Sequence, residues 1–123
     1  MATNQRYALL PSATVTASGQ SGPFQVGDVF ELLVFVNVAL VSGTTPTLNV
    51  FIDTSFDGDS TWTQVCASTQ ITAIGQQVFA LGAGVAALNG VASGIPFGDT
   101  IRVRYALGGT TPSFTVAISA VGK

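Results

Sequence analysis

The chain has 123 residues, of which 47% are hydrophobic and only 8% are charged, whereas an ordinary soluble domain has about 25% charged residues. This length suits a single domain, and so few charges favour a packed β protein that hides much of its surface in an assembly. The lack of histidine and the single cysteine exclude a His-based triad, a Cys/His zinc site and an intrachain disulfide, and the net charge of −2 with four scattered basic residues argues against nucleic-acid binding.

The N-terminal residues 1–11 are a candidate arm in front of a single domain over 12–123. In such an arm, apolar side chains could anchor on a neighbouring subunit, and an arginine could pair with a carboxylate of that neighbour. The residues concerned are Arg6, Tyr7, Leu9 and Leu10. The alternatives are a frayed terminus or a first edge strand. The segment lacks the long apolar stretch of a signal peptide, so we expect a protein made in a cytoplasm.

Alternating apolar residues predict a long strand after a first candidate strand at 12–18. From Phe30 to Leu40 every second residue is apolar and shares one face. The opposite face is also partly apolar, because Leu33 and Phe35 stand beside Glu31 and Asn37. A strand covered on both faces is central or meets a neighbouring subunit. Leu33 and Phe35 are therefore candidate interface residues. The apolar run 32–41 is about half a membrane span, so no membrane partner is expected.

One short phrase occurs twice in the chain. Residues 43–50 read GTTPTLNV and residues 109–116 read GTTPSFTV. Alternating strands precede and follow each copy, and glycine and proline favour turns. Each copy is therefore predicted to be the corner of a β-hairpin, with Gly108 and Gly109 supplying positive φ. The threonines are then ordinary loop residues; the alternative is that the two loops are equivalent contact points.

The stretch DTSFDGDSTW, residues 53–62, is the richest in polar side chains. Its opening matches that of a calcium loop, but Gln64 stands where an EF-hand needs a glutamate. It is also similar to the Asp-box, a structural hairpin motif, except that Asp59 replaces the glycine. The simplest interpretation is a hairpin turn at Asp57 whose side chains bond the local backbone, with Trp62 packing inward.

The remaining elements complete an all-β prediction. Candidate strands lie at 61–67, 76–81, 101–107 and 114–120, while the glycine-broken segment 82–94 could be a strand, a helical turn or a loop. Cys66 is predicted to be a buried, unreactive thiol. Seven or eight strands with turn signals between them predict an antiparallel β-sandwich, for which an eight-stranded jelly roll is the first choice.

No residue pattern indicates catalysis. The glycines of 82–94 fit neither a phosphate-binding loop nor a dinucleotide-binding loop. Asp53, Asp57 and Asp59 could supply an acid/base pair, but three acids in one turn are more often a solvated loop. The sequence therefore predicts a protein that is not an enzyme and has no cofactor and no metal site.

Four phrases of the chain resemble small structural proteins of bacteriophage virions. They are ATVTASGQSGPF, SGTTPTLNVFIDTSFDGDSTWTQV, GDTIRVRYALGG and TTPSFTVAISAVGK. They resemble the capsid-decoration type, also called cement or auxiliary head proteins, which are commonly jelly-roll-like and often trimeric. The resemblance implies a homotrimer on the outer surface of an expanded phage capsid that clamps neighbouring major capsid proteins.

Two other classes of function fit a β-sandwich. A tail structural protein or adhesin would use the same fold and would form rings or tubes. A carbohydrate-binding module would need an exposed aromatic platform beside polar groups. Trp62 with the acids of 53–60 is the candidate for such a platform, and its expected inward packing argues against it.

Overall fold

The structure, a computed structural model, describes residues 5–26, 31–55, 57, 60–82 and 98–122. Six antiparallel strands and no helix are found in these ranges. The strands are β1 (Gln5–Val15), β2 (Gly19–Gln25), β3 (Leu32–Ser55), β4 (Thr63–Ala67), β5 (Gly75–Leu81) and β6 (Thr100–Gly122). All six belong to one sheet, in which β3 and β6 pair along their whole length.

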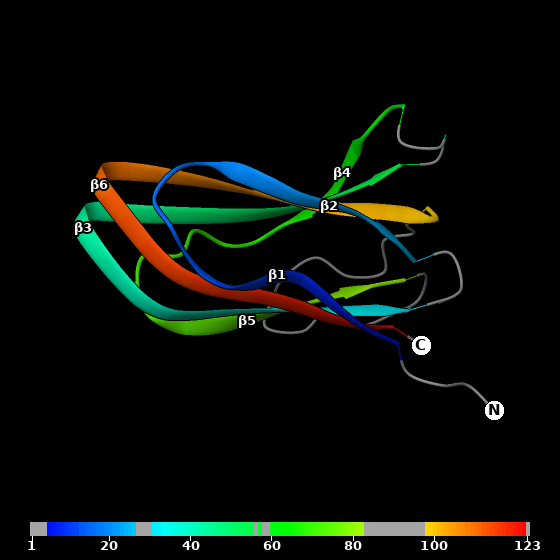
Figure 1. Cartoon of the computed structure of the whole chain (residues 1–123), viewed down its shortest axis with the longest axis horizontal. Coiled ribbons are helices and arrows are strands. Elements are labelled where there is room, and N and C mark those ends of the chain that lie inside the picture. The colour runs from blue at the N-terminus through cyan, green and yellow to red at the C-terminus, as the bar shows by residue number, and fades with distance from the viewer. Residues whose placement is uncertain (1–4, 27–30, 56, 58–59, 83–97, 123) are drawn as a thin grey trace.

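The sheet bends back on itself, so that two layers face each other (Figure 1). We call layer A the part made of β1, residues 113–122 of β6, residues 32–42 of β3, and β5. Layer B is made of β2, residues 100–108 of β6, residues 47–55 of β3, and β4. Each layer contains four strand segments, and only β3 and β6 run through both layers.

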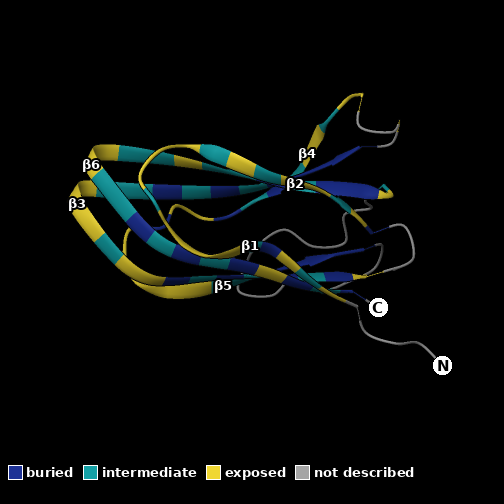
Figure 2. Cartoon of the chain, in the orientation of Figure 1, coloured by how far each residue is buried: buried dark blue, intermediate teal, exposed yellow. Residues whose placement is uncertain are grey.

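The core fills the space between the two layers (Figure 2). Period-two alternation supplies it, because every second residue of a strand points to the same face. Layer A contributes Val34, Val36, Val38, Phe79, Phe114, Val116 and Ile118, and layer B contributes Leu48, Val50, Ile52, Ile101 and Val103. The alternation predicted for 101–107 and 114–120 is thus confirmed at these positions.

Leu40 departs from the predicted core face, with 63% of its surface exposed. The register of β3 against β6 shifts between Val38, which pairs with Val116, and Leu40, which pairs with Thr115. One extra residue in a strand reverses the direction of every side chain that follows it. After the shift, Val41 packs against the core in place of Leu40.

The two GTTP phrases do not form hairpin corners, so that prediction was wrong. Each phrase lies inside a continuous strand, at the bend between the layers, and Thr44 of one copy pairs with Thr110 of the other. Gly43 and Gly109 have φ of 113° and 101°, and Thr45 and Thr111 each have φ of 46°. The same backbone bend in both copies carries β3 and β6 together from layer A into layer B. Gly108 was also predicted to have a positive φ, but it is not among the glycines whose φ is positive.

The bend explains why the strand number differs from the eight expected. A hairpin corner ends one strand and begins another, whereas a paired bend keeps the hydrogen-bond ladder running through it. The candidate strands at 61–67 and 76–81 are found as β4 and β5. The segment 12–18 divides between the end of β1 and the turn before β2, and most of 82–94 lies outside the described residues.

Candidate functional site

The outer face of layer B carries a compact polar array around Asp53. Strand pairing places Asp53 opposite Arg102, and Phe51 opposite Arg104. The carboxylate of Asp53 accepts hydrogen bonds from Nε of both arginines, at 2.8 Å for Arg102, and a further one from Nη2 of Arg104 at 3.0 Å. Although Asp53 is on an outer face, only 2% of its surface is exposed, because the two arginines cover it.

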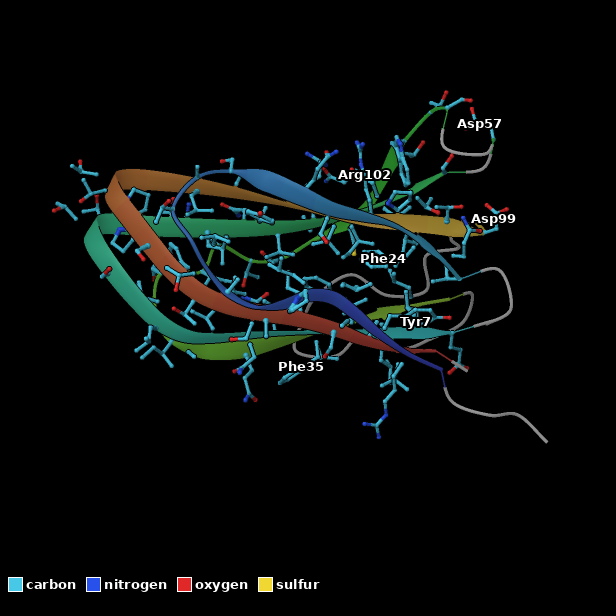
Figure 3. The ribbon with its side chains drawn as sticks, viewed as in Figure 1. Tyr7, Phe24, Phe35, Asp57, Asp99 and Arg102 are labelled. Carbon is cyan, nitrogen blue, oxygen red and sulfur yellow. The ribbon has the colours of Figure 1, made fainter. Side chains whose placement is uncertain are left out.

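Aromatic rings hold both arginines in place. The guanidinium carbon of Arg102 lies 4.6 Å from the centre of the Trp62 ring, and that of Arg104 lies 4.8 Å from the centre of Phe51. Arg104 also donates from Nη2 to Oε1 of Gln64 at 2.9 Å. Cation–π stacking of this kind contributes about 0.5–1 kcal/mol per pair at exposed positions. The array therefore links β3, β4 and β6 on the outside of layer B, where Figure 3 shows Arg102.

The charges of the array are mutually stabilising. Burial works to raise the pKa of Asp53, but hydrogen bonds from Arg104 and Arg102 and their positive charges outweigh it, so the pKa of this carboxyl lies below its ordinary value. The hydrogen bond to Asp53 likewise raises the pKa of Arg104. The carboxyl of Asp53 is therefore ionised at neutral pH, and two guanidinium groups against one carboxylate leave the array with one excess positive charge.

The turn after β3 is held by its own side chains, as predicted. Oδ1 of Asp57 accepts from the backbone N–H of Thr61 at 2.8 Å and from the hydroxyl of Ser55 at 2.9 Å. The bond from Thr61 is the main reason that the pKa of Asp57 is lowered. The pairing of Thr54 with Thr63 confirms that the turn joins two antiparallel strands.

Two interpretations of the acidic stretch change with this geometry. Trp62 does not pack inward, because it is half-buried and stacks with Arg102 on the outer face. In a calcium loop Asp53 would be the first ligand, but its carboxylate is bound by Arg102 and Arg104 instead. Gly58 and Asp59 of the same stretch lie outside the described residues.

The outer face of layer A has a different character. Five apolar side chains from three neighbouring strands point away from layer B and are half-buried: Leu33, Phe35, Val78, Ala117 and Val121. We call this set the apolar face. Phe35 pairs with Val78 on one side and Ser119 on the other. Figure 3 shows Phe35 and Arg102 on opposite outer sides of the molecule.

The residues expected in an N-terminal arm lie in β1, which pairs with β6 at the edge of layer A. Leu9 is fully buried, and Tyr7 and Leu10 are half-buried and pack against the core. A register shift around Leu9 turns these apolar side chains inward. The three apolar side chains therefore pack against this chain's own core from an edge strand, which agrees with the alternative of a first edge strand, while Arg6 is exposed. Residues 1–4 lie outside the described residues.

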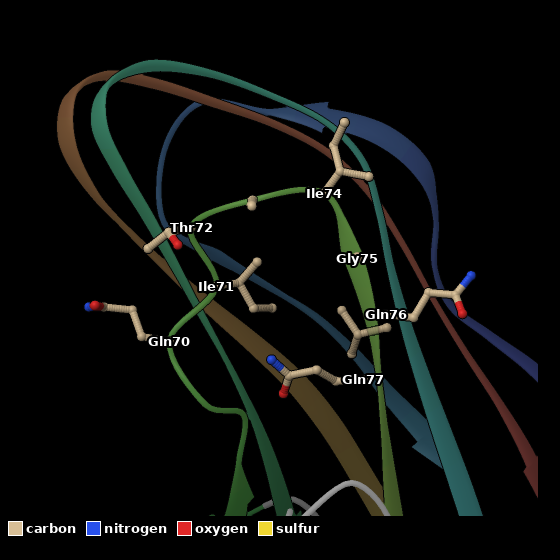
Figure 4. A pocket seen from close by; sticks show the side chains of 9 residues that line it. Gln70, Ile71, Thr72, Ile74, Gly75, Gln76 and Gln77 are labelled. Atoms are coloured by element: carbon tan, nitrogen blue, oxygen red, sulfur yellow. The ribbon is translucent and has the colours of Figure 1, made fainter.

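A small hollow of about 230 Å³ lies under the connection between β4 and β5 (Figure 4). Its lining contains no charged side chain. Gln77 fastens the connection, because its side-chain amide donates to the hydroxyl of Thr69 at 2.8 Å and accepts from its N–H at 3.2 Å. Backbone bonds between Ile71 and Leu48 close it further. These hydrogen bonds hold the connection between β4 and β5 against the strands of both layers.

Cys66 is expected to resist thiol reagents in the folded protein. Its thiol is buried, and the loss of water around it is the main cause that raises its pKa to about 12. Only the thiolate reacts quickly, so a chromogenic disulfide reagent should find no reactive thiol near neutral pH and one per chain after unfolding in urea. Reaction of the native protein at the rate of a free peptide thiol would contradict the buried position.

The described residues include no group of three or more Cys, Asp or Glu side chains arranged to hold a metal ion. They also contain no helix long and apolar enough to cross a membrane.

The two clusters of the outer faces differ in how far the sequence revealed them. Alternation alone placed Leu33 and Phe35 outward, and it placed Arg102 and Arg104 together on the outer side of their strand. Their link to Asp53 was missed, because it depends on the pairing of β3 with β6. The hairpin prediction had instead paired the segment before each GTTP phrase with the segment after it.

No protein-family model matches the chain, and no curated protein matches it.

Proposed function

We propose that this chain is a non-enzymatic structural protein of a bacteriophage virion, which associates with copies of itself and binds the outer surface of the capsid. The observation that carries the proposal is the apolar face on the outside of layer A. A sheet face of a monomer is expected to be polar where it meets water. Here its centre is apolar, and the whole chain has only 8% charged residues.

The fold that suits this role is an eight-stranded jelly roll. Counting each long strand as two segments, divided at its bend, gives eight segments along the chain. Their order is 1-8-3-6 in layer A and 2-7-4-5 in layer B. Two interleaved Greek keys, the pattern of double-sheet jelly rolls in viral capsid proteins, have this alternation between layers. The pairing of β3 with β6 resumes on both sides of the bend, with register shifts around Thr44, so that both layers share the same two strands.

A capsid-stabilising protein needs rigidity and complementary surface rather than chemistry. A protein that binds only the assembled shell stabilises the shell by mass action. Leu33 and Phe35 come from a central strand of layer A, so their positions are fixed by pairing on both sides. A trimer is favoured by the resemblance to decoration proteins, with the major capsid protein as the partner in a virion made in the host cytoplasm.

Replacing Phe35 with glutamate is expected to dissociate the assembly. Burying a phenylalanine side chain contributes about 1.5–3 kcal/mol, and a glutamate would place a charge in the same contact, so the dissociation constant should rise at least about 100-fold. Light scattering after size exclusion should give three times 12.5 kDa for the wild type and 12.5 kDa for the variant. Circular dichroism should be the same for both.

The matched control is Ile74→Glu, since Ile74 is apolar, 65% exposed, and lies on the connection before β5 rather than on the apolar face. This variant should keep the mass of the wild type. A monomeric wild type, or a Phe35→Glu variant that stays assembled, would overturn the proposed role of the apolar face. Rings or tubes in electron micrographs would point to a tail protein instead. Binding to isolated expanded heads, and a higher temperature of head disruption, would support the capsid role.

A further inference from the structure

We infer that a hollow on layer B binds an acidic saccharide unit. The hollow has a volume of about 450 Å³ and lies between the start of β2 and the paired strands β3 and β6. Its lining residues are Ser18, Gly19, Gln20, Phe51, Arg104, Tyr105 and Ala106. A volume of a few hundred Å³, with apolar walls and a few convergent polar groups, is typical of small-ligand sites.

The walls of the hollow suit a sugar ring. Phe51 supplies aromatic surface on the outer face, which packs against the C–H groups of a ring, whereas Tyr105 pairs with the core residue Val50 and directs its side chain to the core face.

Polar groups around the hollow have bonding capacity left for hydroxyl groups. Gln20 stands directly opposite Arg104 in the pairing of β2 with β6, so the two side chains share the outer face. Gln20 is exposed, and no partner for its amide is found within the described residues. Ser18 Oγ accepts from the backbone N–H of Leu107 at 3.0 Å, which leaves its own hydroxyl hydrogen available.

The positive charge beside the hollow selects an acidic ligand. Arg104 uses Nε and Nη2 for Asp53 and Gln64, and in the part of the chain that the structure describes Nη1 has no such bond. Stacking on Phe51 and the bond to Asp53 hold the guanidinium still. Two arginines against one aspartate leave one excess positive charge, and a fixed guanidinium edge matches a carboxylate. A carboxylate on a sugar ring combines all these features.

Nuclear magnetic resonance titration of the ¹⁵N-labelled protein tests this inference. N-acetylneuraminate is the acidic probe, added to about 10 mM, a concentration that fills most of a site with a Kd of about 1 mM. The expected result is a set of saturable shifts confined to Ser18–Gln20, Ala106 and the Arg104 Nε–H. Glucose at the same concentration should cause much smaller shifts, since it lacks the carboxylate.

Two substitutions in the same strand provide a matched pair. Gln20→Ala should weaken binding about fivefold through one lost hydrogen bond, whereas Gln25→Ala, an equally exposed glutamine of β2 beyond the hollow, should leave it unchanged. Arg104→Lys should also weaken binding, because lysine keeps the charge but loses the planar fork. The Phe35→Glu variant should bind like the wild type, so this site and the apolar face are tested separately.

Three outcomes would overturn the inference. These are shifts that are absent or scattered over the molecule, equal shifts with glucose, and equal weakening by Gln20→Ala and Gln25→Ala. N-acetylglutamate provides a further arm with a carboxylate but no sugar ring. If it bound as well as N-acetylneuraminate, the hollow would be a docking point for an acidic peptide and the saccharide assignment would be wrong.

Discussion

Replacing Gly109 with alanine is expected to lower the free energy of unfolding by about 3 kcal/mol. Gly109 has a φ of 101°, where an L side chain is strained at a cost of about 1–3 kcal/mol. The new Cβ would also overlap the backbone carbonyl oxygen of Thr45 and lie 2.8 Å from that of Thr44. Backbone atoms of a paired strand cannot move aside cheaply. Urea denaturation followed by circular dichroism measures the change.

The second copy of the phrase gives an internal check. At Gly43 a Cβ would lie 2.6 Å from the carbonyl oxygen of Thr111, so each glycine fits against the threonines of the other copy. Gly43→Ala should therefore cost as much as Gly109→Ala. The double variant should cost less than the sum, because both changes strain the same bend.

The control for this series is Gly75→Ala at the start of β5. No atom lies within 4 Å of a Cβ built there, and the substitution restricts the unfolded chain, so stability should stay the same or rise by up to about 1 kcal/mol. If Gly109→Ala behaved like Gly75→Ala, the bend would not depend on the reciprocal fit of the two copies.

Asparagine in place of Asp53 is expected to destabilise the protein by about 2 kcal/mol at neutral pH. The substitution keeps the shape of the side chain but leaves Arg102 and Arg104 facing each other without the carboxylate that neutralises them. Breaking a fully buried ion pair costs about 3–5 kcal/mol. The value here is lower, because about a quarter to a third of each arginine side chain is exposed and water screens the charges.

Acid should have the same effect on the wild-type protein. The pKa of Asp53 is lowered in the folded state, so its contribution is fully present above the unfolded value of about 3.9 and is lost as pH falls below it. Urea denaturation at a series of pH values should show this loss in the wild type and a flatter curve in Asp53→Asn.

Asp57→Asn is the control for the acid experiment. Asp57 is exposed, and among the described residues its hydrogen bonds stay within its own turn, so this substitution should change stability much less than Asp53→Asn. Equal effects of the two substitutions would show that the carboxylate of Asp53 has no special role in joining the strands.

The sequence was informative wherever the signal is local. Alternation gave the faces of 101–107 and 114–120, and hydrogen bonding by Asp57 and Ser55 follows from ordinary turn chemistry. The repeated phrase misled, because a glycine–threonine bend inside a paired strand and a hairpin corner need the same residue types. Only long-range pairing, such as Thr44 with Thr110, distinguishes the two.

The polar array around Asp53 could not be predicted from the sequence, because it too depends on long-range strand pairing. Asp53 and the two arginines are far apart in the sequence, and they meet because β3 lies beside β6 in one particular register. The direction of the Trp62 side chain depends on the same strand pairing, because its ring stacks with the guanidinium of Arg102 on the outer face. A tryptophan next to a turn is otherwise expected inside.

The paired bend also has a consequence for how the chain folds. Neither layer can form its central pair from neighbouring residues, because Leu32 must find Gly122 and Ser55 must find Thr100. Closing such long loops costs entropy before any contact is gained, so folding is expected to be slow compared with a protein built from hairpins. Because the same two strands pass through both layers, neither layer can reach its native pairing before both halves of the chain have met.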